Sequence, residues 1–207
     1  MHGVRVSRIR FNRTEDCDGE DPVKSILIGG MGNVLLGDDA LGPYVVHLLE
    51  TQFTFETDVQ LEDLGTPALD LTHRIAGQDA VILIDCISTE EYPAGTVLEY
   101  DKSDLLGVIP AQRLDPHSPA LSECLLAAEM LGRSPESILL VGAVGERFDP
   151  GEPLSEAIRC AVEKIIGAIL GELWRLGVKV ERRASSSCSS EWWAERLCIT
   201  AGQQLVH

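Results

Sequence analysis

The sequence predicts an α/β fold: a three-layer α/β/α sandwich built on a mostly parallel, twisted sheet of about five strands. Short apolar runs, of the kind that form buried strands, alternate along the chain with segments whose apolar residues recur at helical spacing. Strands separated by helices pair in parallel, and the helices then cover both faces of the sheet. Hydrophobic residues make up 44% of the 207 residues and charged residues 24%, which is typical of a folded globular chain.

The first half of the chain contains four expected elements. Ser25–Gly29 is a short apolar run that ends in glycine, as a central strand does, and Leu41–Leu49 has apolar residues at helical spacing. Asp58–Leu64 alternates between apolar and polar residues, which indicates a strand with one polar face. Ala68–Ile75 is an expected helix, because Pro67 suits the start of a helix.

The second half contains five expected elements. Ala80–Asp85 is the clearest buried strand in the chain, and Thr96–Tyr100 is an additional strand. Pro119–Leu131 is expected to be a helix, and Ile138–Val141 is a further core strand. Leu154–Leu176 is a long amphipathic helix.

Charge and composition divide the chain into three parts. Of the formal net charge of −16, residues 1–24 contribute zero and residues 178–207 contribute +1, so residues 25–177 carry −17. We expect a polar N-terminal extension at 1–24, the folded domain at 25–177, and a Ser-rich linker with a short amphipathic tail at 178–207. A chain this acidic is a poor partner for nucleic acid, which binds basic faces.

Cysteine usage and hydropathy bear on the compartment and on possible partners. The six cysteines form no C-x-x-C pair, so we expect reduced thiols rather than a zinc site or a disulfide framework. No apolar run reaches the roughly 18 residues that a membrane helix needs, and the first ten residues lack the apolar core of a secretion signal. We expect a cytoplasmic monomer with no membrane partner.

Three strand-associated loops carry side chains suited to metal or proton chemistry. They are the glycine-rich loop with Asp38 and Asp39, the strand end at Asp85, and the loop that holds His117. A nucleotide site in the first loop is disfavoured, because Leu35 stands where a dinucleotide fingerprint needs its third glycine and the aspartates would repel phosphate. An aspartate of this pair could instead cap the next helix.

Four segments, taken in order, resemble the hydrogenase maturation endopeptidases, the family that removes a C-terminal extension from the precursor of the [NiFe]-hydrogenase large subunit. Gly30–Pro43 is similar to the opening signature of the family, and Asp63–Leu71 resembles its glycine-threonine segment. Ile82–Asp85 resembles its strand that ends in aspartate, and His117–Leu121 its histidine-led helix start. The resemblance spans roughly residues 26–166.

The resemblance implies the site residues. The family's metal-contacting positions fall on Asp39, Asp85 and His117, which we also expect to be catalytic. The resemblance further implies that nickel is supplied by the substrate and is no resident cofactor, although other divalent ions could occupy the site. Two carboxylates and an imidazole suit such an ion. The substrate-binding residues that we name are Gly65, Thr66 and Asp38, and a structural role for Asp38 as a helix cap stays open.

The sequence leaves open both the mechanism of peptide-bond cleavage and the class of function. The docked metal could polarise the scissile carbonyl or activate water, or Asp39 and Asp85 could act as an acid–base pair. A serine or cysteine nucleophile is disfavoured, because the sequence has no Gly-x-Ser-x-Gly elbow. The competing classes are a non-enzymatic nickel-binding or chaperone module for hydrogenase assembly, and a small-molecule hydrolase or nucleotide enzyme.

Overall fold

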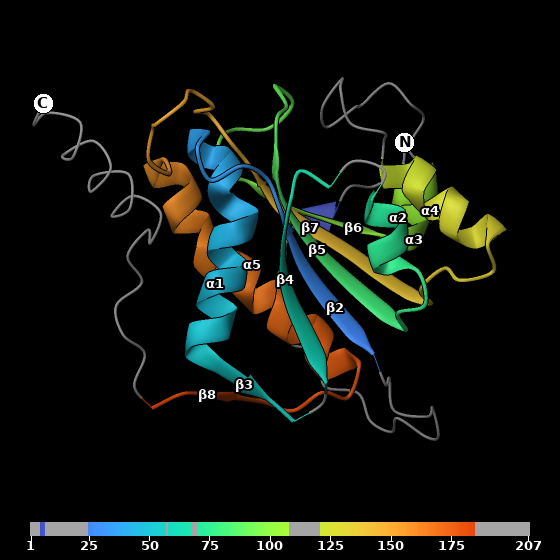
Figure 1. Ribbon diagram of the computed structural model, residues 1–207. Helices are drawn as coiled ribbons and strands as arrows, with labels where there is room; N and C mark the ends of the chain where they lie inside the picture. The colour runs from blue at the N-terminus through green and yellow to red at the C-terminus, as the bar shows by residue number, and fades with distance from the viewer. Residues whose placement is uncertain (1–4, 7–24, 57, 68–69, 108–120, 185–207) are drawn as a thin grey trace, which may run out of the picture.

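The computed structural model describes residues 5–6, 25–56, 58–67, 70–107 and 121–184 (Figure 1). The strands in these ranges are β1 (Arg5–Val6), β2 (Ile26–Met31), β3 (Phe53–Phe55), β4 (Val59–Gly65), β5 (Ala80–Ile87), β6 (Val97–Asp101), β7 (Ser137–Val144) and β8 (Val180–Arg182). The helices are the 3₁₀ helix η1 (Gly37–Ala40), α1 (Leu41–Gln52), α2 (Leu71–Ile75), α3 (Lys102–Gly107), α4 (Leu121–Met130) and α5 (Glu156–Arg175).

The larger sheet has the strand order β1-β6-β7-β5-β2-β4. The pairs β7–β5, β5–β2 and β2–β4 are parallel, whereas β6 runs antiparallel to β7 and β1 antiparallel to β6. Residues 88–96, between β5 and β6, form no helix that would carry the chain back across the sheet, so β6 runs in the opposite direction. The expected mostly parallel sheet is confirmed, and in the described residues it has six strands because the short β1 extends one edge.

Helices cover both faces of this sheet, which confirms the three-layer arrangement. Figure 1 shows α1 and α5 on one side and α2, α3 and α4 on the other. In β2, Ile26 and Ile28 pack into the core beneath α1 and α5, whereas Leu27 packs into the core beneath α2 and α4. Successive side chains of β5 and β7 alternate between these two cores in the same way. Because both faces are buried, these strands are apolar throughout, which is why they were recognisable in the sequence.

The observed elements follow the expected ones, with differences at their ends. β5 continues to Ile87, so Asp85 lies near the end of the strand and does not terminate it. β2 likewise extends beyond Gly29 to Met31. The helix expected from Ala68 is observed from Leu71, and residues 68–69 lie outside the described part of the chain. None of the described helices has the length and apolarity to cross a membrane.

The folded chain also extends past the boundaries expected from charge. β8 pairs antiparallel with β3, and Val178 just before it is buried, so the domain continues beyond residue 177. Near the N-terminus, β1 pairs with β6 although it lies within the expected extension 1–24. Strands of two or three residues carry no periodic signal, and these pairings join parts of the chain more than 90 residues apart.

Candidate active site

The sheet order places three strand ends next to one another. β5, β2 and β4 are consecutive neighbours and run parallel, so their carboxyl ends lie at the same edge of the sheet. Asp85 lies near the end of β5, η1 with its two aspartates follows β2, and Thr66 follows β4 directly. This edge is where open α/β sheets bind ligands.

Glycines allow helix α1 to pack directly on these strand ends. A Cβ atom on Gly42 would overlap the backbone of Met31 and lie 2.7 Å from the carbonyl oxygen of Ile84. A Cβ on Gly30 would overlap the carbonyl of Gly42 in return. Because neither position has room for a methyl group, the first turn of α1 and the preceding η1 are held against β2 and β5.

Replacing Gly42 with alanine is expected to lower the free energy of unfolding by about 1–3 kcal/mol, because the added methyl group must displace backbone atoms. The matched control is Gly167→Ala in α5, where no atom lies within 4 Å of the added Cβ. Alanine there should raise the free energy of unfolding by up to about 1 kcal/mol, since alanine favours helix. Urea denaturation measures both, and equal effects at the two positions would contradict the packing argument.

Asp39 is held in place by the loop that leads into η1. The backbone N–H of Asn33 donates to Asp39 Oδ2 at 2.8 Å. Gly32 has a φ of +129° and packs so tightly against the backbone of Asp39 that a Cβ atom would overlap it. Gly32 also donates its N–H to the carbonyl of Gly65 at 2.8 Å, which joins this loop to the end of β4. The Asp39 side chain keeps some exposure to solvent.

Asp85 is a partly buried carboxyl beside Asp39. The pKa of Asp85 is raised to about 7, chiefly because burial penalises the charged form and also because the negative charge of Asp39 lies nearby. The backbone N–H of Cys86, which donates to Asp85 Oδ1 at 2.9 Å, opposes the rise. Near neutral pH this carboxyl is therefore able both to hold and to release a proton, as a general acid or base must.

The raised pKa of Asp85 predicts a pH dependence of stability. Between about pH 4, near the pKa of an unfolded aspartate, and about pH 7 the native state binds the additional proton. The free energy of unfolding should therefore fall as the pH rises through this window. We expect Asp85→Asn, which carries no charge, to be more stable than the wild type at pH 8 and about equal to it at pH 4. Urea denaturation at both pH values measures the difference, and a difference independent of pH would contradict this interpretation.

Asp38 is fully buried and joins η1 to a distant part of the chain. Its Oδ2 accepts hydrogen bonds from the backbone N–H groups of Glu146 (2.8 Å) and Arg147 (3.0 Å), and its Oδ1 accepts from that of Ser155 (2.6 Å). Ser155 is the N-cap of α5, and its side chain accepts from the N–H of Ile158. The carboxylate thus lies at the positive end of the α5 dipole, which favours its charge.

This geometry supports the expected structural role for Asp38, although at a different helix, and not the expected contact with substrate. Its side chain has no exposed surface and both oxygens are engaged by backbone donors, so it is not available to contact a substrate. It does not cap the helix that follows it either, since neither η1 nor α1 has a side-chain cap hydrogen bond. Asp38 instead supports its neighbour Asp39 by fixing η1 to the loop after β7 and to α5.

Cys86 is a buried thiol that sequence reasoning did not place at the site. Its Sγ packs against Gly145, which also contacts Asp38 and Phe148. Burial raises the pKa of the Cys86 thiol, and the nearby charges of Asp85, Asp38 and Asp39 raise it further. A thiol that stays protonated is a poor nucleophile, which agrees with the expectation that no cysteine attacks the substrate. The position of Cys86 directly after Asp85 is the feature of the sequence that could have placed it at the site.

Gly65 and Thr66 lie at the end of β4 beside the Gly32 loop. Gly65 has a φ of +58°, and no atom lies within 4 Å of the position its Cβ would take. Its N–H is fixed by Asp63 Oδ1 at 2.9 Å, and Thr66 is exposed. The space beside Gly65 and the exposure of Thr66 leave room for another chain where β4 forms the edge of the sheet, and a role in binding substrate stays a prediction.

The structure brings together two of the three expected metal-contacting residues. Asp39 and Asp85 share the carboxyl edge of the sheet, and the charge of one acts on the other. His117 lies outside the described residues, so the complete set of three stays a prediction. In the described part of the chain, no three histidine, cysteine, aspartate or glutamate side chains form a metal-binding group.

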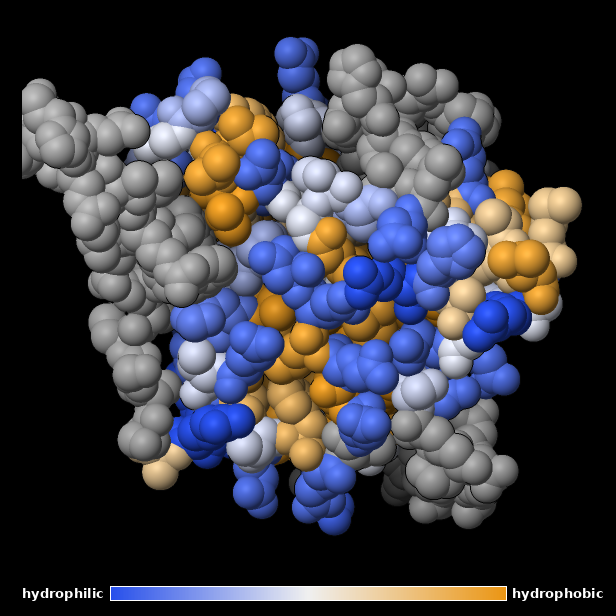
Figure 2. Space-filling model, viewed as in Figure 1, coloured by the Kyte–Doolittle hydropathy of each residue, from blue (hydrophilic) through white to orange (hydrophobic). Residues whose placement is uncertain are grey.

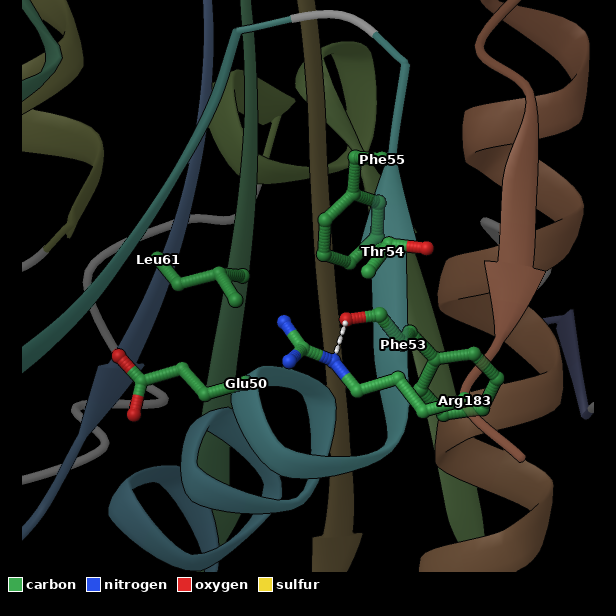
Figure 3. A pocket seen from close by; sticks show the side chains of 6 residues that line it. All are labelled: Glu50, Phe53, Thr54, Phe55, Leu61 and Arg183. Carbon is green, nitrogen blue, oxygen red and sulfur yellow. Dashed lines mark hydrogen bonds between the residues drawn. The ribbon is translucent and has the colours of Figure 1, made fainter. Parts of the chain in front are cut away.

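An open groove of about 450 Å³ lies elsewhere, at the far end of α1 (Figure 3). Side chains from α1, β3, β4 and the segment after β8 line it, namely Glu50, Phe53, Thr54, Phe55, Leu61 and Arg183. The Arg183 Nε donates to the carbonyl of Phe53 at 3.0 Å, which fixes the guanidinium in the groove. Helix α1 begins at the candidate active site and spans 12 residues, so roughly 18 Å separates the two.

Comparisons with known proteins agree on one family. The family model described as HycI, hydrogenase maturation protease, matches residues 43–172. The chain is 28% identical over 154 residues to the hydrogenase 2 maturation protease of Escherichia coli, covering 74% of this chain and 93% of the relative. It is 30% identical over 158 residues to the hydrogenase expression/formation protein HoxM of Cupriavidus necator, covering 75% of this chain and 77% of the relative.

A solved structure shares the fold. The hydrogenase maturating endopeptidase HybD from Escherichia coli superposes with a TM-score of 0.71 at 28% identity, covering 77% of this chain and 98% of the other. The family model and the two Escherichia coli relatives are described as proteases or endopeptidases, and this chain is likewise a peptidase. It belongs to the hydrogenase maturation protease family, which confirms the resemblance and favours an enzyme over the non-enzymatic module. Asp85 lies within the matched range, and Asp39 lies shortly before it.

Proposed function

We propose that this chain removes the C-terminal extension from the nickel-loaded precursor of a [NiFe]-hydrogenase large subunit. The observation that carries the proposal is the pair of carboxylates, Asp39 and Asp85, on neighbouring strand ends at the ligand-binding edge of the sheet. Membership of the maturation protease family supports it.

Recognition of nickel follows from the donor set. Asp39 and Asp85 supply oxygen ligands and His117 an imidazole, a combination that suits a divalent ion such as Ni²⁺. The raised pKa of Asp85 means that its carboxyl has a proton to lose before it binds metal. The positive charge of a nickel ion carried by the precursor would favour that loss. In this proposal the metal is cargo of the substrate, and the enzyme holds no resident ion.

Hydrolysis adds one water molecule across the scissile bond. The water oxygen attacks the carbonyl carbon, the carbon–nitrogen bond breaks, and the leaving nitrogen gains a proton. In this proposal Asp85 takes the proton from the attacking water and passes it to the leaving nitrogen, with Asp39 beside it. The substrate's nickel would stabilise the negative charge that develops on the carbonyl oxygen.

Gly65 and Thr66 are proposed to hold the substrate backbone next to these carboxylates. The loop hydrogen bond from Gly32 to Gly65 joins the end of β4 to the loop that fixes Asp39. The open space at Gly65 allows another backbone to approach closely, which a side chain would prevent. Gly65→Val should therefore raise KM more than it lowers kcat.

The test is cleavage of purified precursor with and without nickel. The purified chain is incubated with each form, and mass spectrometry detects the shortened large subunit together with the released C-terminal peptide. We expect cleavage of the nickel-loaded form only. Equal cleavage of the nickel-free form would contradict metal recognition, and absence of any shortened product would contradict the proposed substrate.

A further inference from the structure

Strand β4 forms one edge of the large sheet. In the described part of the chain it pairs with β2 alone, so alternate backbone N–H and C=O groups along its seven residues point away from the sheet. Exposed edges are commonly blocked by lysine, proline or a bulge in mid-strand. β4 contains neither residue type, and its register shift falls at the end of the strand, next to Gly65. Its edge is therefore able to pair with an extended chain.

The two ends of this edge lead to two features already described. At its carboxyl end, Gly65 and Thr66 lie beside the loop that holds Asp39. Toward its other end, Leu61 lines the groove that contains Arg183 (Figure 3). Seven residues of strand span about 23 Å, so one extended segment could reach from the carboxylates to the groove. Figure 2 shows apolar side chains among hydrophilic ones on this face of the molecule.

We propose that the C-terminal extension of the precursor binds as an added strand along β4 and runs antiparallel to it. The inference rests on the proposed function, because it requires the scissile bond to lie at Asp39 and Asp85. The extension follows that bond in sequence, so it must lead away from the site. From Gly65 the edge leads toward Val59, opposite to the direction of β4. Antiparallel addition to an exposed edge is a common mode of peptide binding.

The side chains around this edge restrict the chemistry of the bound segment. Side chains of an added strand alternate between the two faces of the sheet, so every second one would lie on the face where Leu61 points into the groove. Glu50 and Asp63 make the surroundings acidic, which disfavours an acidic segment. Figure 3 shows the terminal nitrogens of Arg183 directed into the groove, where they suit a carboxylate such as the free C-terminus of the extension.

The test compares precursors whose extension is whole or shortened to two residues. We expect the chain to cleave the shortened form at least ~10-fold less efficiently, because it lacks the strand pairing. In complex with the whole extension, but not the shortened one, the backbone amides of residues 59–65 should exchange more slowly in hydrogen–deuterium exchange. The Asp85→Asn variant is used for the exchange measurement, so that the extension stays attached.

Two further comparisons separate strand pairing from other contacts. Proline placed at successive positions of the extension should slow cleavage at every second position, because alternate N–H groups donate to β4. Arg183→Glu should lower kcat/KM for the whole extension about 3- to 10-fold and leave the shortened one unchanged. The matched control is Arg182→Glu, at a neighbouring exposed arginine on β8 that does not line the groove, and it should change neither.

The remaining outcomes distinguish failure of the strand proposal from failure of the proposed function. If both extensions are cleaved at equal rates and exchange along β4 is unchanged, strand addition is wrong and the peptidase assignment stands. If the wild type cleaves neither nickel-loaded precursor, the proposed function is wrong, and the strand proposal falls with it. Protection of β4 that grows with the concentration of this chain alone would indicate pairing between two copies, which would also overturn the proposal.

Discussion

Replacing Asp39 or Asp85 with alanine is expected to lower the rate of precursor cleavage by about two to four orders of magnitude, the range associated with loss of a positioned acid or base. Each substitution removes a carboxylate from the same edge of the sheet, and the pKa of Asp85 is raised by its burial and further by the charge of Asp39. The corresponding substitution of His117 should have a similar effect if it completes the metal-contacting set. Cleavage is measured with saturating nickel-loaded precursor.

The control for these variants is Glu163→Ala on the exposed side of α5, which removes one negative charge far from the strand ends. Its cleavage rate should stay within about twofold of the wild type, since surface substitutions have small effects. Thermal unfolding of every variant separates loss of the site from loss of the fold. Wild-type rates in both aspartate variants would remove these residues from the mechanism.

Replacing Asp38 with asparagine is expected to lower the free energy of unfolding by roughly 3–5 kcal/mol. An amide has one acceptor oxygen where the carboxylate has two, so its NH₂ group would face the buried N–H of Ser155 or those of Glu146 and Arg147. The cost comes from buried donors left without an acceptor and from loss of a charge at the N-terminus of α5. Urea denaturation measures the change.

Asp149→Asn is the matched control for Asp38, because it makes the same chemical change at an exposed position in the same loop. Its free energy of unfolding should stay within about 0.5 kcal/mol of the wild type. The Asp38 variant should also show a lower cleavage rate at temperatures where it is fully folded, because η1 then loses its attachment. If the Asp38 variant were as stable as the control, its hydrogen bonds would not be the support that we infer.

The core of the fold could be predicted from the sequence because its signal is local. β5 and β7 are apolar throughout since both faces are buried, and α1 and α5 have helical spacing. The short strands β3 and β8 could not be predicted, because their pairing depends on a contact between segments about 127 residues apart. The antiparallel direction of β6 likewise follows from how the chain returns to the sheet and leaves no mark in its composition.

The candidate site, like the fold, could be predicted only in part from the sequence. The rule that side chains at the carboxyl ends of parallel strands converge pointed to Asp85 and to the loop with Asp38 and Asp39, and the resemblance to the family singled out Asp39; their roles stay predictions. The hydrogen bonds of Asp38 could not be predicted in this way, because its partners are backbone N–H groups, which every residue except proline possesses. Spacing and residue type therefore cannot identify such a contact, whereas the absence of any solvent exposure at a charged side chain identifies it at once.

The attachment of η1 also has a consequence for the timing of biosynthesis. Asp38 depends on donors 108 to 117 residues further along the polypeptide. At about 5–20 residues per second, a ribosome needs roughly 5–25 seconds to make them after Asp38 has been added. During that interval the nascent chain already contains Asp39 and, for much of it, Asp85, but not the segment that secures them. The nascent chain should therefore not cleave other polypeptides until translation has passed Ser155.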